Sequence, residues 1–158
     1  MNRRQFTAAL AGLFALHRTA VAATPATQKI EKLVLKPEEW MKRLTPEQFA
    51  VLRQEGTERA GTSPLDREKR KGTYACAGCD LPLFESHMKY DSGTGWPSFF
   101  TFIPGRLGTK TDFKLILPRT EYHCIRCGGH QGHVFDDGPP PTGKRYCNNG
   151  IALRFIPA

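Results

Sequence analysis

Two pairs of cysteines constrain the fold of this chain of 158 residues more than any other feature. Cys76 and Cys79 form one CxxC pair, Cys124 and Cys127 form the second, and residues 80–123 lie between them. A tetrahedral zinc ion takes four such thiolates at about 2.3 Å. The pattern therefore predicts a zinc ion that joins two distant parts of one domain. Because cysteines fill all four positions, the predicted role of this ion is structural.

Two other uses of these cysteines remain open. In an oxidising compartment the four thiols can form two disulfides. A redox-active CxxC is the second alternative, although the chain lacks the βαβ pattern of thioredoxin-like proteins. His123 adjoins one pair and is a further possible ligand, but four cysteines already complete a zinc site.

Short strands and frequent turns are expected from Thr73 onward. The chain has 15 glycines and 12 prolines, and no segment of helical length separates the expected strands. This pattern argues against a parallel βαβ architecture. We predict a mainly β domain of twisted antiparallel sheets. The expected strands are 73–75, 82–85, 112–117, 122–123, 133–135, 145–147 and 151–156.

Two or three short helices are expected before the sheets. Residues 36–44 carry apolar side chains at helical spacing. Thr45 is placed to cap a second helix, with Pro46 in its first position. Gln48 completes a capping box, and the helix is expected to end near Gly56.

The first residues have the features of an export signal. Arg3-Arg4-Gln5-Phe6 resembles a twin-arginine motif, and the apolar run that follows is too short to span a bilayer. Ala20-Val21-Ala22 fits a cleavage site. An ordinary secretory signal and a disordered cytosolic tail are the alternatives. We expect a periplasmic protein without a stable membrane anchor, divided into a removed signal at 1–22, a polar linker at 23–35 and one folded domain at 36–158.

The net charge gives little support to nucleic-acid binding. The formal charge is +8, and loss of three arginines with the signal reduces it to about +5. The remaining basic residues are scattered and form no stripe. We therefore expect no nucleic-acid partner.

Cys147 is the only cysteine outside a CxxC pair, and it lies in a predicted hairpin whose turn is Pro139-Pro140-Pro141. Strand alternation places Arg145, Cys147 and Asn149 on one face. A guanidinium and an amide beside a thiol favour a chemical role over packing. Cys147 is therefore the candidate nucleophile, with a buried inert thiol as the alternative.

Four further segments, together with the CxxC pairs, resemble the methionine-R-sulfoxide reductases of the B family. The resemblance covers roughly residues 36–157. The matching segments are EWMKRLTPEQFAVLRQEGTER at 39–59, YDSGTGWPSF at 90–99, GHVFDDGP at 132–139 and RYC at 145–147.

The resemblance implies a β-tent-like fold and a defined reaction. Cys147 would attack the sulfur of the R epimer of methionine sulfoxide in proteins and become a sulfenic acid. Arg145 and a histidine would favour its thiolate, and a histidine would protonate the sulfoxide oxygen. Trp96 would hold the substrate methyl group. The other implied site residues are His130, His133, Asn149 and Asp137, the last of which would orient Arg145 or a histidine.

One departure from the family pattern concerns recycling of the enzyme. Many members have a second cysteine where this chain has Thr94. Because the other four cysteines are assigned to zinc, we expect an external thiol, such as a thioredoxin-like dithiol, to reduce Cys147. We also expect a monomer. A zinc-knuckle binding module without catalysis is the alternative function.

The register of the hairpin determines which of the two histidines shares a face of the sheet with Cys147. Pairing Phe135 with Lys144 in a tight hairpin puts His130, but not His133, on the face of Cys147. Both histidines reach that face only if the strand bulges, and Gly132 is where we expect the bulge.

Overall fold

A computed structural model describes residues 30–114 and 117–158, so the predicted export signal and residues 23–29 of the linker lie outside the described part. In this part the chain forms two α-helices, three short 3-10 helices and nine strands. The helices are α1 (Pro37–Arg43), α2 (Pro46–Gln54), η1 (Pro64–Arg67), η2 (Ser86–Met88) and η3 (Gly150–Ala152). The strands are β1 (Gly72–Cys76), β2 (Pro82–Glu85), β3 (Lys89–Tyr90), β4 (Ser98–Phe99), β5 (Leu107–Asp112), β6 (Arg119–Cys124), β7 (His130–Phe135), β8 (Arg145–Asn148) and β9 (Leu153–Pro157).

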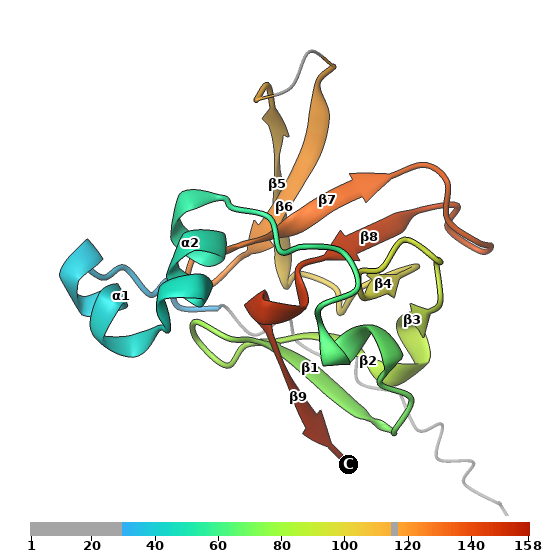
Figure 1. Ribbon diagram of the computed structural model, residues 1–158, viewed down its shortest axis with the longest axis horizontal. Helices are drawn as coiled ribbons and strands as arrows, with labels where there is room; N and C mark the ends of the chain where they lie inside the picture. Colours follow the sequence, from blue (N-terminus) through green and yellow to red (C-terminus); the bar gives the residue numbers. More distant parts are fainter. Residues whose placement is uncertain (1–29, 115–116) are drawn as a thin grey trace, which may run out of the picture.

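The strands form two antiparallel sheets, as Figure 1 shows. The smaller sheet has the order β2-β1-β9, and the larger has the order β3-β4-β8-β7-β6-β5. The β5–β6 hairpin extends away from the rest of the domain (Figure 1). The predicted mainly β, antiparallel fold is confirmed.

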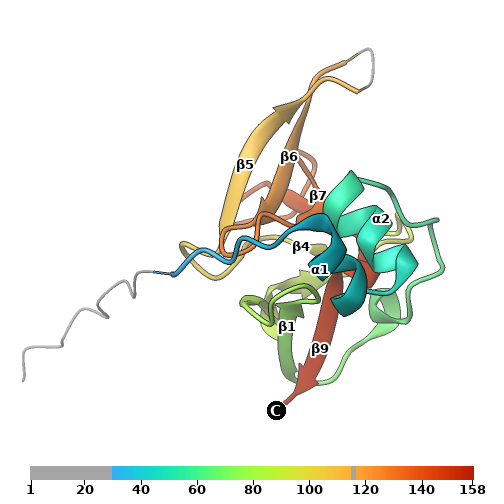
Figure 2. The ribbon, with the colours of Figure 1, turned by 90° about the vertical axis from the view of Figure 1, so that its left-hand side faces the viewer.

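Helix α2 begins as its sequence predicts. The Thr45 hydroxyl accepts a hydrogen bond from the Gln48 backbone N–H at 3.2 Å, and the Gln48 side chain accepts one from Thr45 N–H. Pro46 occupies the first turn, and Glu55 ends the helix with φ 55°. Figure 2 shows both helices on the same side of the sheets, where α2 contacts β7 and η3.

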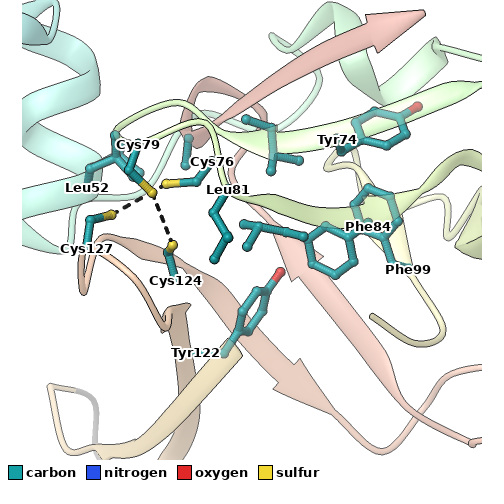
Figure 3. Packing of buried hydrophobic residues seen from close by; sticks show 14 of the residues in the cluster. Leu52, Tyr74, Cys76, Cys79, Leu81, Phe84, Phe99, Tyr122, Cys124 and Cys127 are labelled. Carbon is teal, nitrogen blue, oxygen red and sulfur yellow. Dashed lines mark hydrogen bonds between the residues drawn. The ribbon is translucent and has the colours of Figure 1, made fainter. Parts of the chain in front are cut away.

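The core lies between the two sheets and contains a cluster of aromatic side chains. Phe84 of β2 stacks on Phe99 of β4 with ring centroids 4.0 Å apart, and Tyr74 of β1 meets Phe99 edge-on at 5.1 Å. Tyr122 of β6 is fully buried and completes the cluster (Figure 3). Aromatic side chains bury large apolar areas, so this cluster binds the sheets together.

The last residues of the predicted linker belong to the packed domain. Ile30, Leu33 and Leu35 are partly buried against the core, and Leu33 N–H donates to the carbonyl of Arg126 at 2.8 Å. No helix within residues 30–114 and 117–158 is long and apolar enough to cross a membrane.

One expected strand was placed wrongly. Residues 112–117 were expected to form it, but β5 comprises Leu107–Asp112, and residues 113, 114 and 117 are not in a strand; residues 115–116 lie outside the described part. This strand lies at the edge of the larger sheet, and three of its six residues are exposed. An edge strand needs only one paired side and can be polar, so its composition does not reveal it.

The register of the β7–β8 hairpin differs from the prediction by one residue. Phe135 pairs with Arg145 and not with Lys144, and His133 pairs directly with Cys147. Residues 136–144 form the connection, which is closed by hydrogen bonds between Gly138 and Gly143 and between Gly143 and Pro139. This loop is too long for the tight hairpin that was assumed.

The expected irregularity near Gly132 is present. His130 and Gly132 pair with adjacent residues of β6, so Gln131 between them has no partner there. Gly132 also lies against β8, where an added Cβ would be 1.9 Å from the carbonyl oxygen of Cys147. A glycine is therefore required for β7 and β8 to approach at this point.

We predict that Gly132→Ala lowers the free energy of unfolding by about 3 kcal/mol, because backbone would have to move to admit the methyl group. Gly105→Ala is the control, since its φ is 75° but no atom lies within 4 Å of the added Cβ. It should cost about 1 kcal/mol from backbone strain alone. Urea unfolding measures both values, and equal losses would contradict the close approach.

Candidate active site and metal centre

Direct cross-strand pairing places one side chain from each strand of the larger sheet in a single row. Residues directly opposite each other in antiparallel strands share a face. Cys147 of β8 therefore lies between a serine of β4 and a histidine of β7. The whole row is Tyr90, Ser98, Cys147, His133, Glu121 and Lys110.

A cavity of about 250 Å³ opens at Cys147. The predicted site residues His133, Arg145, Asn149 and Trp96 line it together with Cys147. Other lining residues come from the loop after α2, from the segment before β4 and from β6 to β8. They are Thr57, Thr94, Arg119, Gly132, Phe135 and Asn148.

Arg145 is held by a carboxylate and an aromatic ring. Its Nε donates to Oδ1 of Asp137 and its terminal NH2 group to Oδ2, each at 2.8 Å. Its guanidinium carbon lies 4.3 Å from the ring centroid of Phe135. Asp137 therefore orients Arg145, which is one of the two options expected for it.

Trp96 and Asn149 are fixed by contacts to the backbone. Trp96 Nε1 donates to the Glu58 carbonyl at 2.9 Å. The Asn149 side chain accepts from Glu58 N–H at 2.8 Å and donates to the Gln131 carbonyl at 3.0 Å. Because both ends of the amide are engaged, Asn149 holds the bulged residue Gln131 and the loop after α2 at the cavity.

The two histidines lie side by side but differ in access. Their ring centroids are 5.4 Å apart. His133 lines the cavity, whereas His130 is buried and does not. His130 Nδ1 lies 2.8 Å from a Glu121 carboxylate oxygen, and its Nε2 has no hydrogen-bond partner among the described residues. Burial raises the pKa of Glu121, but hydrogen bonds from His123 and His130 outweigh it and lower the value to about 2. Glu121 therefore remains ionised beside His130.

Sequence reasoning missed Asp112 and Glu121 as partners of the two histidines. Asp112 Oδ2 lies 2.7 Å from His133 Nε2. Asp112 was expected to begin a strand and in fact ends one, so its contact could not be anticipated. Glu121 offered a signal, since a carboxylate within a central strand requires a polar partner.

Thr94, at the position of the absent second cysteine, belongs to a chain of hydroxyl groups. Its Oγ1 lies 2.8 Å from Ser92 Oγ, which lies 2.7 Å from Ser98 Oγ. Ser98 is the register partner of Cys147. These linked hydroxyl groups thus place a hydroxyl, and not a thiol, near Cys147.

Burial raises the pKa of Cys147 above that of a free cysteine. The charge of Arg145 and hydrogen bonds from Thr94 and Arg145 lower it, but less strongly. Arg145 thus favours the anion, but burial has the larger effect on the pKa of Cys147.

We predict that the alkylation rate of Cys147 by iodoacetamide rises with pH around a midpoint above that of a free cysteine, because the thiolate is the reactive form. Arg145→Gln removes the favourable charge and should move the midpoint further up. Arg154→Gln is the control, since Arg154 lies on β9 and pairs with Asp80 in the turn after β1. Mass spectrometry of the Cys147 peptide gives both midpoints. A lower or unchanged midpoint in Arg145→Gln would contradict this account.

The other four cysteines form one cluster, in which Cys76 and Cys127 sulfurs are 3.6 Å apart and Cys79 and Cys124 sulfurs 3.5 Å apart (Figure 3). All four sulfurs lie within 4.8 Å of one another. These separations exceed an S–S bond of about 2.05 Å and fit four thiolates around one metal ion. The cluster is therefore a metal site and not a pair of disulfides.

The two CxxC turns are built alike. Cys76 ends β1, and its carbonyl accepts from Asp80 N–H at 2.8 Å; Cys124 ends β6, and its carbonyl accepts from Gly128 N–H at 2.8 Å. Asp80 and Gly128 both have positive φ, at 60° and 67°. Each turn directs two sulfurs to the same point, so the ion would connect the smaller sheet to the larger.

Comparisons with known proteins agree with this site. Residues 44–157 match the family model described as the SelR domain. The chain is 53% identical over 129 residues to the chloroplastic peptide methionine sulfoxide reductase B1 of Arabidopsis thaliana, a match that covers 81% of this chain and 64% of that protein.

Two other relatives are matched over most of their length. Identity to the peptide methionine sulfoxide reductase MsrB of Methanosarcina barkeri is 55% over 119 residues, which are 75% of this chain and 84% of that protein. Identity to the MsrB of Pseudomonas putida is 52% over 131 residues, or 82% and 96% of the two chains. This chain thus spans less than two thirds of the plant protein but most of these two. The relatives do not favour a binding module without catalysis. The chain belongs to the SelR family of peptide methionine sulfoxide reductases.

Proposed function

We propose that the protein reduces the R epimer of methionine sulfoxide in other proteins, with Cys147 as the nucleophile. One observation carries this proposal. The only thiol outside the metal cluster opens into a cavity that His133, Arg145 and Trp96 also line.

The cavity suits a methionine sulfoxide side chain. At about 250 Å³ it can admit a single side chain while the substrate backbone stays outside. Trp96 offers an indole surface to the methyl group, since aromatic rings interact favourably with sulfur and its neighbouring carbons. The hydrogen bond from Trp96 to Glu58 fixes the ring, so the substrate meets a preformed surface.

The proposed reaction transfers the oxygen atom to Cys147. The thiolate forms an S–S bond to the sulfoxide sulfur, and the S–O bond of the substrate breaks as its oxygen bonds to Cys147 Sγ. The S–S bond then breaks, and methionine leaves with two more electrons. Cys147 is oxidised to a sulfenic acid that retains the oxygen. Thiol and sulfoxide give sulfenic acid and thioether, so no proton is consumed overall.

His133 is the proposed carrier of the proton between the thiol and the sulfoxide oxygen. Burial lowers the pKa of His133 more than its hydrogen bond to Asp112 raises it, so the free imidazole is neutral. A neutral imidazole can accept the thiol proton, and the imidazolium can then donate it to oxygen. Arg145 stabilises the thiolate formed between these steps.

The sulfenic acid is proposed to be reduced by an external thiol. Thr94 lies in the cavity where a second cysteine would be needed, and the remaining cysteines all belong to the metal cluster. A thioredoxin-like dithiol is the proposed class of donor.

Zinc is the proposed ion in the four-cysteine cluster. Four thiolates around one point are its usual structural ligands, and they leave no open position for substrate. It would hold the ends of β1 and β6 together and would take no part in the reaction.

We predict that the purified protein reduces a peptide containing the R epimer and leaves the S epimer unchanged. Cys147→Ser should abolish turnover, because a hydroxyl cannot form the sulfenic acid, while elemental analysis still finds one zinc per chain. Cys79→Ser should instead lose zinc and lower the free energy of unfolding by about 3 kcal/mol or more.

Dimedone labelling followed by mass spectrometry checks the recycling step. After one turnover without reductant, Cys147 should carry the label. A disulfide between Cys147 and another cysteine of the same chain would contradict reduction by an external thiol. Reduction of the S epimer at an equal rate would contradict the proposed function.

We also propose that the protein is exported to the periplasm through the twin-arginine segment at residues 1–22. Replacing both Arg3 and Arg4 with lysine should leave the protein in the cytoplasmic fraction, because this route reads the arginine pair. Equal periplasmic amounts of the variant would contradict the proposal and favour an ordinary secretory signal.

A further inference from the structure

The contact between Asp112 and His133 joins two strands that are not neighbours in the sheet. Asp112 ends β5, His133 lies in β7, and β6 runs between them. Asp112 nevertheless reaches His133 Nε2 at 2.7 Å, and only 9% of the Asp112 side chain and 12% of the His133 side chain are exposed. A short, buried, charge-assisted hydrogen bond of this kind is strong and directional.

We propose that Asp112 is a positioning residue that holds His133 so that its Nδ1 carries the proton to the sulfoxide oxygen. This inference rests on the proposed role of His133 in the reaction. Asp112 does not contact the substrate in this proposal, and it influences the reaction only through the imidazole of His133.

The donor and acceptor roles follow from the chemistry of the carboxylate. A hydrogen bond from the backbone N–H of Lys114 and another from His133 hold the pKa of Asp112 well below its usual range, so the carboxylate is ionised and can only accept. His133 Nε2 must therefore carry a hydrogen. In the neutral ring Nδ1 is then unprotonated, and it is the nitrogen left for the cavity.

Asp112 also stabilises the imidazolium form of His133 during the reaction. The hydrogen bond and charge of Asp112 raise the pKa of His133 against the effect of burial. This arrangement resembles the aspartate of a serine-protease triad, which orients a histidine and stabilises its charged form. The orienting group here comes from an edge strand.

Arg119 contacts Asp112 but has the opposite effect on the pKa of His133. Its terminal NH2 group lies 2.8 Å from Asp112 Oδ2, the same oxygen that accepts from His133. The positive charge of Arg119 lowers the pKa of His133. Removing Asp112 should therefore lower the pKa of His133, and removing Arg119 should raise it.

Among the described residues, the ionisable groups that face His133 come from its own strand, from both neighbouring strands and from the edge strand β5. They are Asp112 of β5, Arg119 and Glu121 of β6, His130 of β7, and Cys147 of β8.

The experiment compares Asp112→Asn with Arg119→Gln in the full domain. NMR titration of isotope-labelled imidazoles gives the pKa of His133 directly, without turnover. In Asp112→Asn the midpoint should fall relative to the wild type, and in Arg119→Gln it should rise. The acidic limb of kcat/KM on the R-epimer peptide should shift in the same direction as each midpoint, because the pair is active only after the imidazolium has lost its proton.

Asp112→Asn should also lower kcat at least tenfold with little change in KM. Thermal unfolding of both variants separates this loss from a loss of folding, and Arg119→Gln carries the test alone if Asp112→Asn does not fold. A His133 midpoint that does not move, or that moves the same way in both variants, would overturn the inference. Absence of R-epimer turnover in the wild type would instead refute the proposed function, whatever the NMR titration shows.

Discussion

Alignment of strands in the larger sheet is the constraint on which the site depends. Cys147 and His133 come from different strands and meet because they are direct partners in the β7–β8 register. A slip of one residue would turn either side chain to the opposite face of the sheet. Two local features prevent this slip. Gly132 permits the close approach of the strands, and Asn149 binds the carbonyl of the bulged Gln131.

The four-cysteine cluster imposes a second constraint at a different place. It joins the end of β1 in one sheet to the end of β6 in the other. The residue before Cys124 on β6 is His123, and Glu121 two positions earlier holds His130. A bound metal would therefore fix the same strand that carries partners of His130 and His133. One strand would then serve both the stability of the fold and the alignment of the site, although the four cysteines do not line the cavity.

Much of the site could be predicted because its chemistry is carried by residues that a strand pattern places together. The CxxC pairs, the unpaired Cys147 and the alternation of Arg145 with it needed only spacing and side-chain type. Asp112 could not be found in this way. It acts across an intervening strand, and its own strand is polar and lies at the sheet edge, where alternation is weak. The register was wrong by one residue because the glycines and prolines of residues 138–143 indicate a turn but do not determine which residues pair on either side of it.

The burial that raises the pKa of Cys147 has a consequence for its resistance to oxidation. Methionine sulfoxide accumulates where oxidants are abundant, and those oxidants convert exposed thiolates to sulfenic and then sulfinic acids. A nucleophile that was ionised at rest would be consumed by peroxide before it met a substrate. Cys147 is partly buried, and burial raises its pKa, so a smaller fraction of it is ionised than of a free cysteine. Under the proposed function, a low thiolate fraction in the free protein would protect the nucleophile from the oxidants that produce its substrate.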